Sequence, residues 1–357
     1  MDRGTFTEPL KLRGVEVANR VWMSPMCQYS AGQDGVPTGW HLVHYGSRAV
    51  GGAGMIMVES TAVGPRHRTT AHDLGIWNAG QVEGHRMLAA QIKELGSVAA
   101  VQLNSAGRKS SHRQPWVQSG QNSAVPVRDG GWVPLAPSAT AFGKLTVPAE
   151  MTAVEVEDVV DAFAAATGNA HEAGYDVVEI HAAHGYLLHQ FLSPVSNHRQ
   201  DGYGGSLENR MRLPLQVAKA VRDAFPPEKP VFVRITATDW IDGGITLEEA
   251  KVFAQRLGGL GIDLLDVTSG ALAVDAPPPN RQGLNLDFAE SLKEAAGIAV
   301  APVGQMADPD LLRNVFESSS VDAVIVGRAL LRDPYYALRL AGGQPQEYWP
   351  SQYHRAL

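Results

Sequence analysis

Cysteine is almost absent from this sequence. Cys27 is the only cysteine among 357 residues, so the chain cannot form an intramolecular disulfide. A single cysteine also excludes zinc sites and iron–sulfur clusters that several thiolates hold. Any redox chemistry in this protein therefore needs another electron carrier.

The sequence also lacks a long apolar run and an excess of positive charge. No uninterrupted apolar stretch approaches the roughly 18 residues that a membrane span requires. The first residues, MDRGTFTEPLKL, carry acids, a glycine and a proline where a signal peptide would be apolar, so we expect a cytoplasmic location and no membrane partner. The 37 acidic residues outnumber the 30 Lys and Arg residues, and the formal charge of -7 disfavours nucleic acid as a partner.

Eight short runs rich in β-branched residues recur along the chain, with helix-like segments between them. Parallel strands that are buried on both faces produce this pattern. Eight such units predict an α/β fold, a (β/α)8 TIM barrel, as a single domain over residues 1–357. We expect its strands near residues 21–26, 55–60, 98–103, 177–181, 231–236, 264–268, 300–304 and 323–327.

Capping signals mark two of the outer helices. Thr152 precedes a long amphipathic segment that Gly174 ends, and Thr246 precedes another. Two segments fall outside the barrel rhythm. PLKLRGVEVAN, before the first strand, predicts an N-terminal hairpin that plugs the bottom of the barrel, and a polar, proline-rich excursion spans residues 104–150 after the third strand. Because barrel active sites lie at the carboxyl ends of the strands, this excursion should cover the catalytic face.

Motifs at the predicted strand ends are more specific than the strand pattern. They read NRVWMSPMCQYS, VESTA, VQLNSAGRKS, EIHAAHGYLLHQFLSPVSNHRQDGYGGSLENR, FVRIT and IVGRALLRDP. Over essentially the whole chain they resemble the strand-end motifs of the Old Yellow Enzyme family, above all its YqjM-like and xenobiotic reductase A-like bacterial branch. The resemblance implies a barrel with bound FMN that passes hydride from NADPH, preferred over NADH, to an activated C=C bond.

Residues suited to a flavin phosphate follow the last two predicted strands. A phosphate needs backbone N–H groups and a fixed cation, which barrels often supply in these loops. Gly304, Gly327 and Arg328 stand there, although spacing alone fits a turn glycine and a solvated arginine equally well. Gln102 and Arg234 stand at strand ends where an amide and a cation can read the pyrimidine edge of the flavin. A buried Arg234 is otherwise hard to explain, because an unpaired buried charge is costly.

The family resemblance assigns the flavin site in more detail. It places Arg234 near N1 and C2=O of the flavin, where it would stabilise negative charge. Cys27 would tune the redox behaviour of the flavin rather than act as a nucleophile, whereas a lone cysteine without this context is more often a small buried hydrophobe. The residues that line the ring would be Ser24, Pro25, Met26, Cys27 and Ser60.

The candidate substrate site is the group His181, His184 and Tyr186, where a strand passes into its loop. A His-x-x-His pair can bind a metal, but Glu179 lies deeper in the strand and no other acid completes a metal cage, so we predict no metal site. By resemblance, the two histidines donate hydrogen bonds to the carbonyl or nitro oxygen of the substrate. Hydride arriving at the β-carbon pushes negative charge onto that oxygen, and preorganised donors stabilise it. Tyr186 is the candidate proton donor to the α-carbon.

Two further residues are candidates for substrate contact. Tyr29 would add a hydrogen bond, or else pack as an aromatic lid over the barrel mouth. Arg355 matches an arginine that, in this branch, reaches the active site of a neighbouring subunit, whereas most terminal residues are solvated. The tail at residues 343–357 is rich in aromatics, which suits an interface, so we expect a homodimer or homotetramer. Leu357 replaces the aromatic residue that ends the family's chains, and Ser105 replaces the histidine of its Q-L-x-H-A-G-R motif.

Two other classes of function remain open on the same fold. One is a metal- or phosphate-dependent lyase or hydrolase, because a TIM barrel does not determine its reaction. The other is a flavin-binding module without catalysis. The histidines outside the candidate site are expected to be structural, namely His41, His44, His189 and His198.

Overall fold

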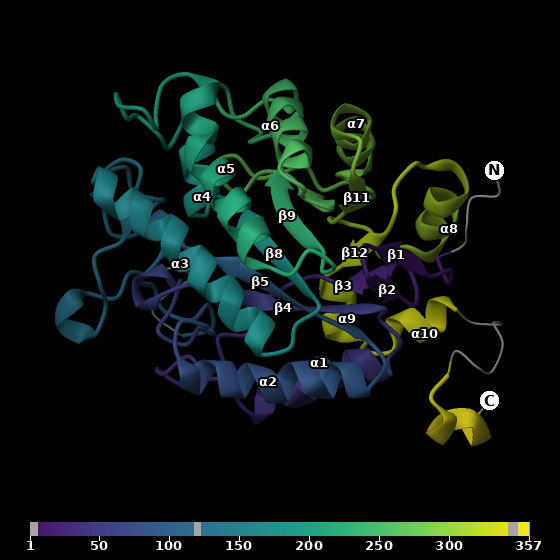
Figure 1. Ribbon diagram of the computed structural model, residues 1–357. Helices are drawn as coiled ribbons and strands as arrows, with labels where there is room; N and C mark the ends of the chain where they lie inside the picture. Colours follow the sequence, from purple (N-terminus) through teal and green to yellow (C-terminus); the bar gives the residue numbers. More distant parts are fainter. Residues whose placement is uncertain (1–5, 118–122, 342–348, 357) are drawn as a thin grey trace.

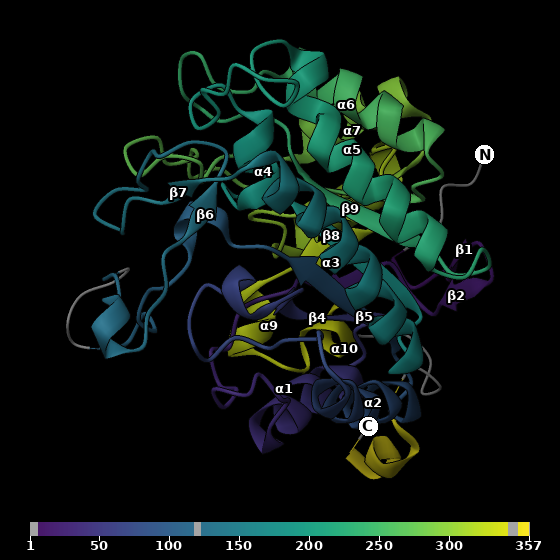
Figure 2. The same cartoon turned by 60° about the vertical axis from the view of Figure 1, so that its left-hand side comes forward.

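The computed structural model describes residues 6–117, 123–341 and 349–356. Its centre is an eight-stranded parallel sheet with the order β11-β10-β9-β8-β5-β4-β3-β12 (Figures 1 and 2). A β-bridge between Val303 and Ile325 joins the two outermost strands and closes the sheet into a barrel. In chain order the strands are β3 (Val21–Met23), β4 (Met55–Ala62), β5 (Val98–Asn104), β8 (Val177–Ala182), β9 (Val231–Thr236), β10 (Leu264–Thr268), β11 (Ala299–Pro302) and β12 (Val324–Val326).

The predicted TIM barrel is confirmed, and the strands differ from prediction mainly at their ends. β3 stops at Met23, short of the predicted residue 26. Pro25 lacks an N–H group and cannot donate to a strand ladder, which accounts for the early end. The last hydrogen bond on this side runs from the Ser24 N–H to the Val326 carbonyl.

Helices cover the outside of the barrel (Figure 1). The Thr152 and Thr246 side chains accept hydrogen bonds from the third helical N–H groups, as predicted, and each forms a capping box with the glutamate there. Gly174, with φ +89°, follows α3 in the left-handed conformation that favours glycine. The helices are α1 (Gly39–Val50), α2 (Ala79–Glu94), α3 (Ala153–Glu172), α4 (Leu187–Leu192), α5 (Leu207–Ala224), α6 (Leu247–Gly259), α7 (Leu286–Ala296), α8 (Pro309–Ser318), α9 (Arg328–Arg332) and α10 (Tyr336–Leu340).

Apolar side chains fill the barrel interior, as barrels of this size require. Trp22 and Phe232 stack there with their ring centroids 6.0 Å apart. The antiparallel hairpin of β1 (Leu10–Leu12) and β2 (Val15–Val17) adds Leu12 and Val17 to the same buried cluster. The predicted hairpin therefore plugs the barrel from below.

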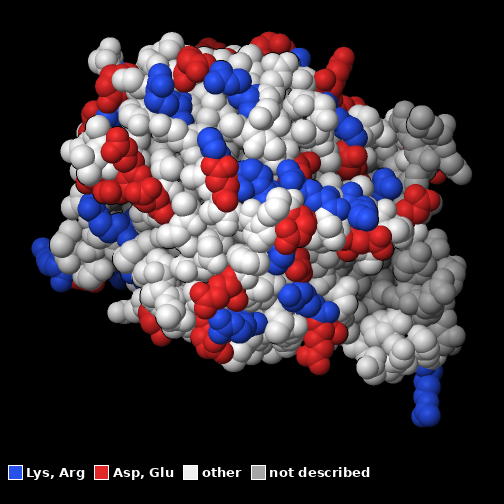
Figure 3. All heavy atoms as spheres, viewed as in Figure 1, with Lys and Arg blue, Asp and Glu red and all other residues white. Residues whose placement is uncertain are grey.

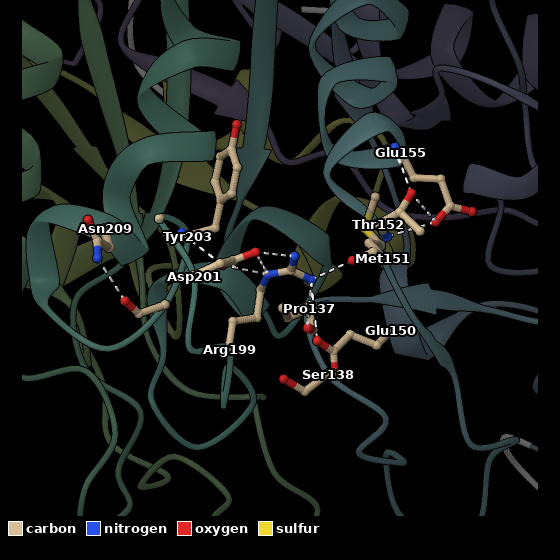
Figure 4. Close-up of polar contacts among 12 residues, drawn as sticks. Pro137, Ser138, Glu150, Met151, Thr152, Glu155, Arg199, Asp201, Tyr203 and Asn209 are labelled. Carbon is tan, nitrogen blue, oxygen red and sulfur yellow. Dashed lines mark hydrogen bonds and ion pairs between the residues drawn. The ribbon is translucent and has the colours of Figure 1, made fainter.

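The excursion after β5 is mostly irregular and ends in the short parallel pair β6 (Leu135–Ala136) and β7 (Ala149–Glu150). Figure 2 shows this pair beside α4. Arg199, between α4 and α5, donates to the Pro137 carbonyl at 3.2 Å and to the Met151 carbonyl at 2.6 Å, and pairs with Asp201 (Figure 4). The signature segment around Arg199 thus fastens the excursion to the barrel.

Acidic and basic side chains lie next to one another over the face shown in Figure 3. Ion pairs of this kind occur between Asp263 and both Arg13 and Arg222. In the described part of the chain, no helix has the length and hydropathy to cross a membrane.

Candidate active site

The end of β8 brings together the three residues predicted for substrate chemistry. His181 is a residue of β8, and Tyr186 is the N-cap of α4. Between them His184 adopts a positive φ of 55°, which turns the chain sharply. The His181 ring centroid lies 5.3 Å from that of His184 and 4.8 Å from that of Tyr186. The three side chains therefore form one cluster.

The surroundings of His181 fix its tautomer. The Ala183 N–H donates to Nδ1 of His181 at 3.2 Å, which requires that nitrogen to be unprotonated. Burial, followed by the nearby His184, lowers the pKa of His181 well below its ordinary value. The ring is consequently neutral and carries its proton on Nε2. It can donate one hydrogen bond without bringing a charge.

His184 is held by two threonines at the ends of neighbouring strands. Its N–H donates to Thr236 Oγ1 at 3.1 Å, and its Nε2 lies 2.9 Å from Thr268 Oγ1. Burial, followed by Arg234, lowers the pKa of His184 well below its ordinary value, so this ring is neutral as well. When the Thr268 hydroxyl donates to Nε2, the proton of His184 resides on Nδ1. The sequence reasoning missed both threonines, whose only signal was their place at strand ends.

Tyr186 and the unpredicted Lys109 lie close together. Burial, followed by the nearby Cys27 and Asp73, raises the pKa of Tyr186 far above its ordinary value, so its phenol keeps its proton. The Lys109 ammonium lies 5.6 Å from the centroid of the Tyr186 ring and donates to the His184 carbonyl at 2.7 Å. Burial, then Arg108, lowers the pKa of Lys109 to about 7. Lys109 could have been found from the sequence by its position in the VQLNSAGRKS motif.

Arg234 has a structural partner, contrary to the argument from sequence. Its Nε donates to Asp266 Oδ2 at 2.6 Å and lies 3.8 Å from Glu179 Oε1, while Nη2 donates to Ser24 Oγ at 3.2 Å. The fold alone therefore explains this buried charge, which the sequence had made hard to explain, because β10 supplies Asp266. Gln102 donates through Nε2 to Glu179 at 2.7 Å, and its Oε1 accepts no hydrogen bond within the described residues. Gln102 thus retains an acceptor for a ligand.

The carboxyl ends of β3 and β12 lie side by side, next to Gly327 and Arg328 of the predicted phosphate site. Parallel pairing sets Val326 opposite Met23. A Cβ on Gly327 would lie 3.5 Å from Met26 Sδ and 3.7 Å from Ser24 Cβ. Nearby Gly304, with φ +119°, follows the bridge that closes the barrel.

Arg328 supplies the cation of this region. Its side chain is exposed and has no hydrogen bond or ion pair to the described chain. A free guanidinium beside two glycines suits a phosphate, and the acceptor on Gln102 with the donors on Arg234 and Ser24 suits a flavin ring. The residues present fit FMN.

A register shift in β4 includes Glu59 and Ser60. The β4–β5 ladder is irregular between Val58 and Thr61. Glu59 faces α1, where its carboxylate accepts from the Tyr45 hydroxyl at 3.1 Å and from the Gln28 N–H at 2.6 Å. Ser60, the next residue, is buried within this irregular stretch. The sequence reasoning missed Glu59, which anchors the loop that carries Cys27.

Cys27 is held as a neutral thiol. Burial, then the negative charges of Asp73 and Glu59, raises the pKa of Cys27 well above its ordinary value. A hydrogen bond with the neighbouring Tyr29 lowers the pKa of Cys27 only in part. Since the thiolate is the nucleophilic form, this environment opposes nucleophilic catalysis by Cys27.

The Tyr29 ring packs against aromatic rings of the excursion. Its centroid lies 5.9 Å from that of Trp116 and 6.4 Å from that of His112, with edge-on geometry. Its contact with a substrate stays a prediction. Ser105, at the position of the family's histidine, has Oγ 2.7 Å from Nδ1 of His67, so an imidazole from another segment stands beside it.

Arg355 is not brought to the site of its own chain. It lies exposed on a short 3-10 helix, Ser351–Ala356. The preceding Tyr353 lines a hollow of about 580 Å³ together with Gly54 and Ser97, which stand just before β4 and β5. The tail therefore packs at the amino ends of the strands, opposite His181. Residues 343–348 of the tail and Leu357 lie outside the described residues.

The histidines expected to be structural have protein partners or lie outside the cluster. His189 Nε2 lies 2.8 Å from Asp239 Oδ1, and His41 Nε2 lies 3.3 Å from Glu59 Oε1. Among the residues that the structure describes, no group of three or more His, Cys, Asp or Glu could hold a metal ion.

Known proteins share this architecture. A model of the NADH:flavin oxidoreductase / NADH oxidase family matches residues 5–347. The NADPH dehydrogenase of Bacillus subtilis (strain 168) is 41% identical over 359 residues, covering 99% of each chain. The structure of morphinone reductase superposes with a TM-score of 0.80 and 27% identity, covering 98% of this chain and 94% of that one. An Old Yellow Enzyme homologue from Zymomonas mobilis gives a TM-score of 0.80 and 25% identity, covering 97% of each chain.

Proposed function

We propose that this chain, which belongs to the NADH:flavin oxidoreductase / NADH oxidase family, is an FMN-dependent ene-reductase. Its relatives show that it is an NADPH-dependent flavin oxidoreductase of the Old Yellow Enzyme type. It reduces the activated C=C bond of small α,β-unsaturated carbonyl or nitro compounds. The observation that carries this proposal is the cluster of His181, His184 and Tyr186, three neutral hydrogen-bond donors at one strand end.

We propose that residues 1–357 form a single FMN-binding domain. Bound FMN supplies the hydride, which it receives from NADPH. Gly304, Gly327 and Arg328 would hold the phosphate, and Gln102 and Arg234 the pyrimidine edge. The residues along the ring would be Ser24, Pro25, Met26, Cys27 and Ser60. We assign Cys27 to tuning the flavin, so that Cys27→Ala should shift the midpoint potential without abolishing turnover; an unchanged potential would contradict this role.

The chain's own residues would handle the substrate oxygen and one proton. His181, through Nε2–H, and His184 donate to the carbonyl or nitro oxygen as negative charge develops there. Losing one such donor costs roughly 3 kcal/mol of barrier. The Tyr186 phenol gives its proton to the α-carbon, and Tyr29 adds a hydrogen bond to the substrate.

We also propose that the protein is a homodimer or homotetramer. The position of Arg355 at the amino ends of the strands leaves it free to enter the site of a neighbouring subunit, as in the resembling branch. The cytoplasmic location remains a prediction.

Anaerobic titration tests the central proposal. Heat-released supernatant should contain FMN at near-stoichiometric amount, NADPH should bleach the flavin absorbance, and a small cyclic enone should restore it. Colourless protein that cannot be reconstituted with FMN would instead favour a lyase or hydrolase. Yellow protein that NADPH reduces but no enone or nitroalkene reoxidises would leave only a reductase of other substrates.

A further inference from the structure

A polar layer lies at the top of the barrel interior, above the apolar side chains that fill it. On β8 this layer is two residues below His181, on the same side of the strand. None of its side chains is more than 4% exposed. Its members are Ser24, Gln102, Glu179, Arg234 and Asp266, whereas β4, β11 and β12 contribute the apolar residues Met57, Ala301 and Ile325 to the interior.

One guanidinium in this layer faces two carboxyl groups. Arg234 donates through Nε to Asp266 Oδ2 at 2.6 Å, and through Nη2 to the same oxygen. Glu179 is further from this charge, with Oε1 3.8 Å from Arg234 Nε. The neighbouring His181 is neutral. If both carboxyl groups were ionised, the layer would hold an uncompensated negative charge away from water, which is costly.

Two oxygens of these carboxyl groups have no partner. Glu179 Oε2 and Asp266 Oδ1 are buried, and neither makes a hydrogen bond within the described residues. Both side chains approach the same atom, Arg234 Nε, at 3.8 Å for Glu179 Oε1 and at 2.6 Å for Asp266 Oδ2, and a hydrogen bond between the two carboxyl groups is among the causes of their pKa shifts. Two facing carboxylate oxygens repel, whereas a proton on one of them makes it a donor to the other. A single proton would therefore satisfy both atoms.

We propose that Glu179 and Asp266 share one proton, held on Glu179 Oε2 and donated to Asp266 Oδ1, so that the layer beneath the flavin carries no net charge. The ion pair with Arg234 places the remaining negative charge on Asp266. Glu179 keeps its second hydrogen bond, in which Oε1 accepts from Gln102 at 2.7 Å.

The electrostatics of the pair agree with this assignment. Burial raises the pKa of Glu179 well above its ordinary value, and the negative charge of Asp266 raises it further; Arg234 and Gln102 oppose this only in part. When two carboxyl groups share one site, one of them stays protonated well above its ordinary pKa, and the proton belongs to the pair.

The consequence for the flavin rests on the proposed FMN site. Arg234 is the cation assigned to the pyrimidine edge, where a reduced flavin accumulates negative charge. A protonated Glu179 leaves one carboxylate to balance Arg234, whereas an ionised Glu179 would add a second and oppose electron uptake. Glu179 is thus a positioning residue whose proton helps to set the flavin potential.

Infrared spectroscopy tests the proton directly, with or without FMN. The spectrum of the wild type minus that of Glu179→Gln should contain the C=O stretch of a protonated carboxylic acid, present from pH 6 to 8. The exposed Glu208→Gln variant serves as the control and should remove no such band. If the Glu179→Gln difference shows only carboxylate bands, the proposal is overturned. Because this readout needs no cofactor, it is separate from a failure to bind FMN.

Redox titration of the FMN-loaded protein tests the consequence. Glu179→Gln keeps a neutral side chain and should leave the midpoint potential unchanged. Combining Glu179→Gln with Asp266→Asn removes both carboxyl groups, leaves Arg234 uncompensated and should raise the midpoint potential. An upward shift in Glu179→Gln would show that Glu179 is ionised in the wild type, and would overturn the proposal. That comparison decides the matter even if the double variant does not fold.

Discussion

At the level of single residues, burial keeps the proton donors of the site neutral. His181, His184, Tyr186 and Cys27 all have pKa values displaced toward their uncharged forms. A neutral donor stabilises charge that develops during the reaction without repelling a nearby cation such as Arg234. Neutrality therefore suits the proposed role of this site, which is to polarise a carbonyl or nitro group beside a fixed positive charge.

Removing the Tyr186 hydroxyl should separate the two half-reactions. Tyr186→Phe keeps the aromatic ring but loses the proton donor, so enone reduction should slow about 100-fold. Flavin reduction by NADPH should stay near the wild-type rate, and stopped-flow measurement of each half-reaction checks both points. Tyr203→Phe, which removes a phenol outside the cluster, is the matched control. Wild-type enone turnover in Tyr186→Phe would show that another group supplies the proton.

Residues that belong to contiguous motifs could be predicted from sequence, and residues that act across the fold could not. His181, His184 and Tyr186 lie within six positions of one another, so their spacing was visible. The Lys109 ammonium donates to the Ala271 carbonyl, which lies 162 residues away in the sequence. The pairing of Arg234 with Asp266 likewise depends on the register of β9 against β10. No pattern within either strand reveals these contacts.

At the level of elements, side-chain contacts determine the path of the excursion after β5. Strand and helix positions followed from periodicity and capping residues such as Thr152. The excursion has no periodicity, and its sequence predicted only that it lies over the catalytic face. Arg199 binds two backbone carbonyls next to the short β6–β7 ladder and so fastens the end of the excursion to the segment between α4 and α5.

Arg199→Ala should loosen the excursion. The Pro137 and Met151 carbonyls would lose buried donors, at a cost of about 2 kcal/mol or more in the free energy of unfolding. Limited proteolysis should cut residues 104–150 faster, and the KM for enones should rise while FMN content stays constant. Arg212→Ala, which removes an exposed arginine that donates to the Gly202 carbonyl, is the control. Equal cleavage rates in the wild type and Arg199→Ala would argue against the clamp.

At the level of the whole molecule, buried histidines tie stability to pH. Burial lowers the pKa of His85 to about 3, and burial followed by Arg48 lowers that of His44 to about 3. Their folded pKa values lie below the unfolded value of about 6.5, so the unfolded state takes up protons first as the pH falls. The stability is fully present above pH 6.5 and is lost progressively toward pH 3.

Acidification from pH 6.5 to 5 should therefore lower the free energy of unfolding by about 2 kcal/mol for each of these histidines. Denaturant titrations at several pH values measure the slope. His85→Gln should reduce it by the share of one histidine, and the exposed His198→Gln should not. A slope that His85→Gln leaves intact would mean that other groups carry the effect.

The C-terminal tail carries the proposed contact with a second subunit. If Arg355 serves the site of a second subunit, Arg355→Ala should raise the KM for enones and leave FMN content unchanged, because the flavin residues are all elsewhere. Arg256→Ala, an exposed arginine on α6, should change neither. Light scattering that shows a monomer at assay concentration, together with wild-type kinetics for Arg355→Ala, would contradict the shared site.

The closure of the barrel between β11 and β12 has a further consequence. Among the described residues this seam carries one isolated bridge, from Val303 to Ile325, and the proposed phosphate residues Gly304 and Gly327 flank it. A phosphate bound to both glycines would hold the two edges of the barrel together. By mass action, a ligand that requires the closed seam stabilises it. Amide hydrogen exchange at residues 303–305 and 324–327 should therefore slow on FMN binding far more than exchange in β8 or β9, so that this seam is where the ring opens first when the cofactor is lost.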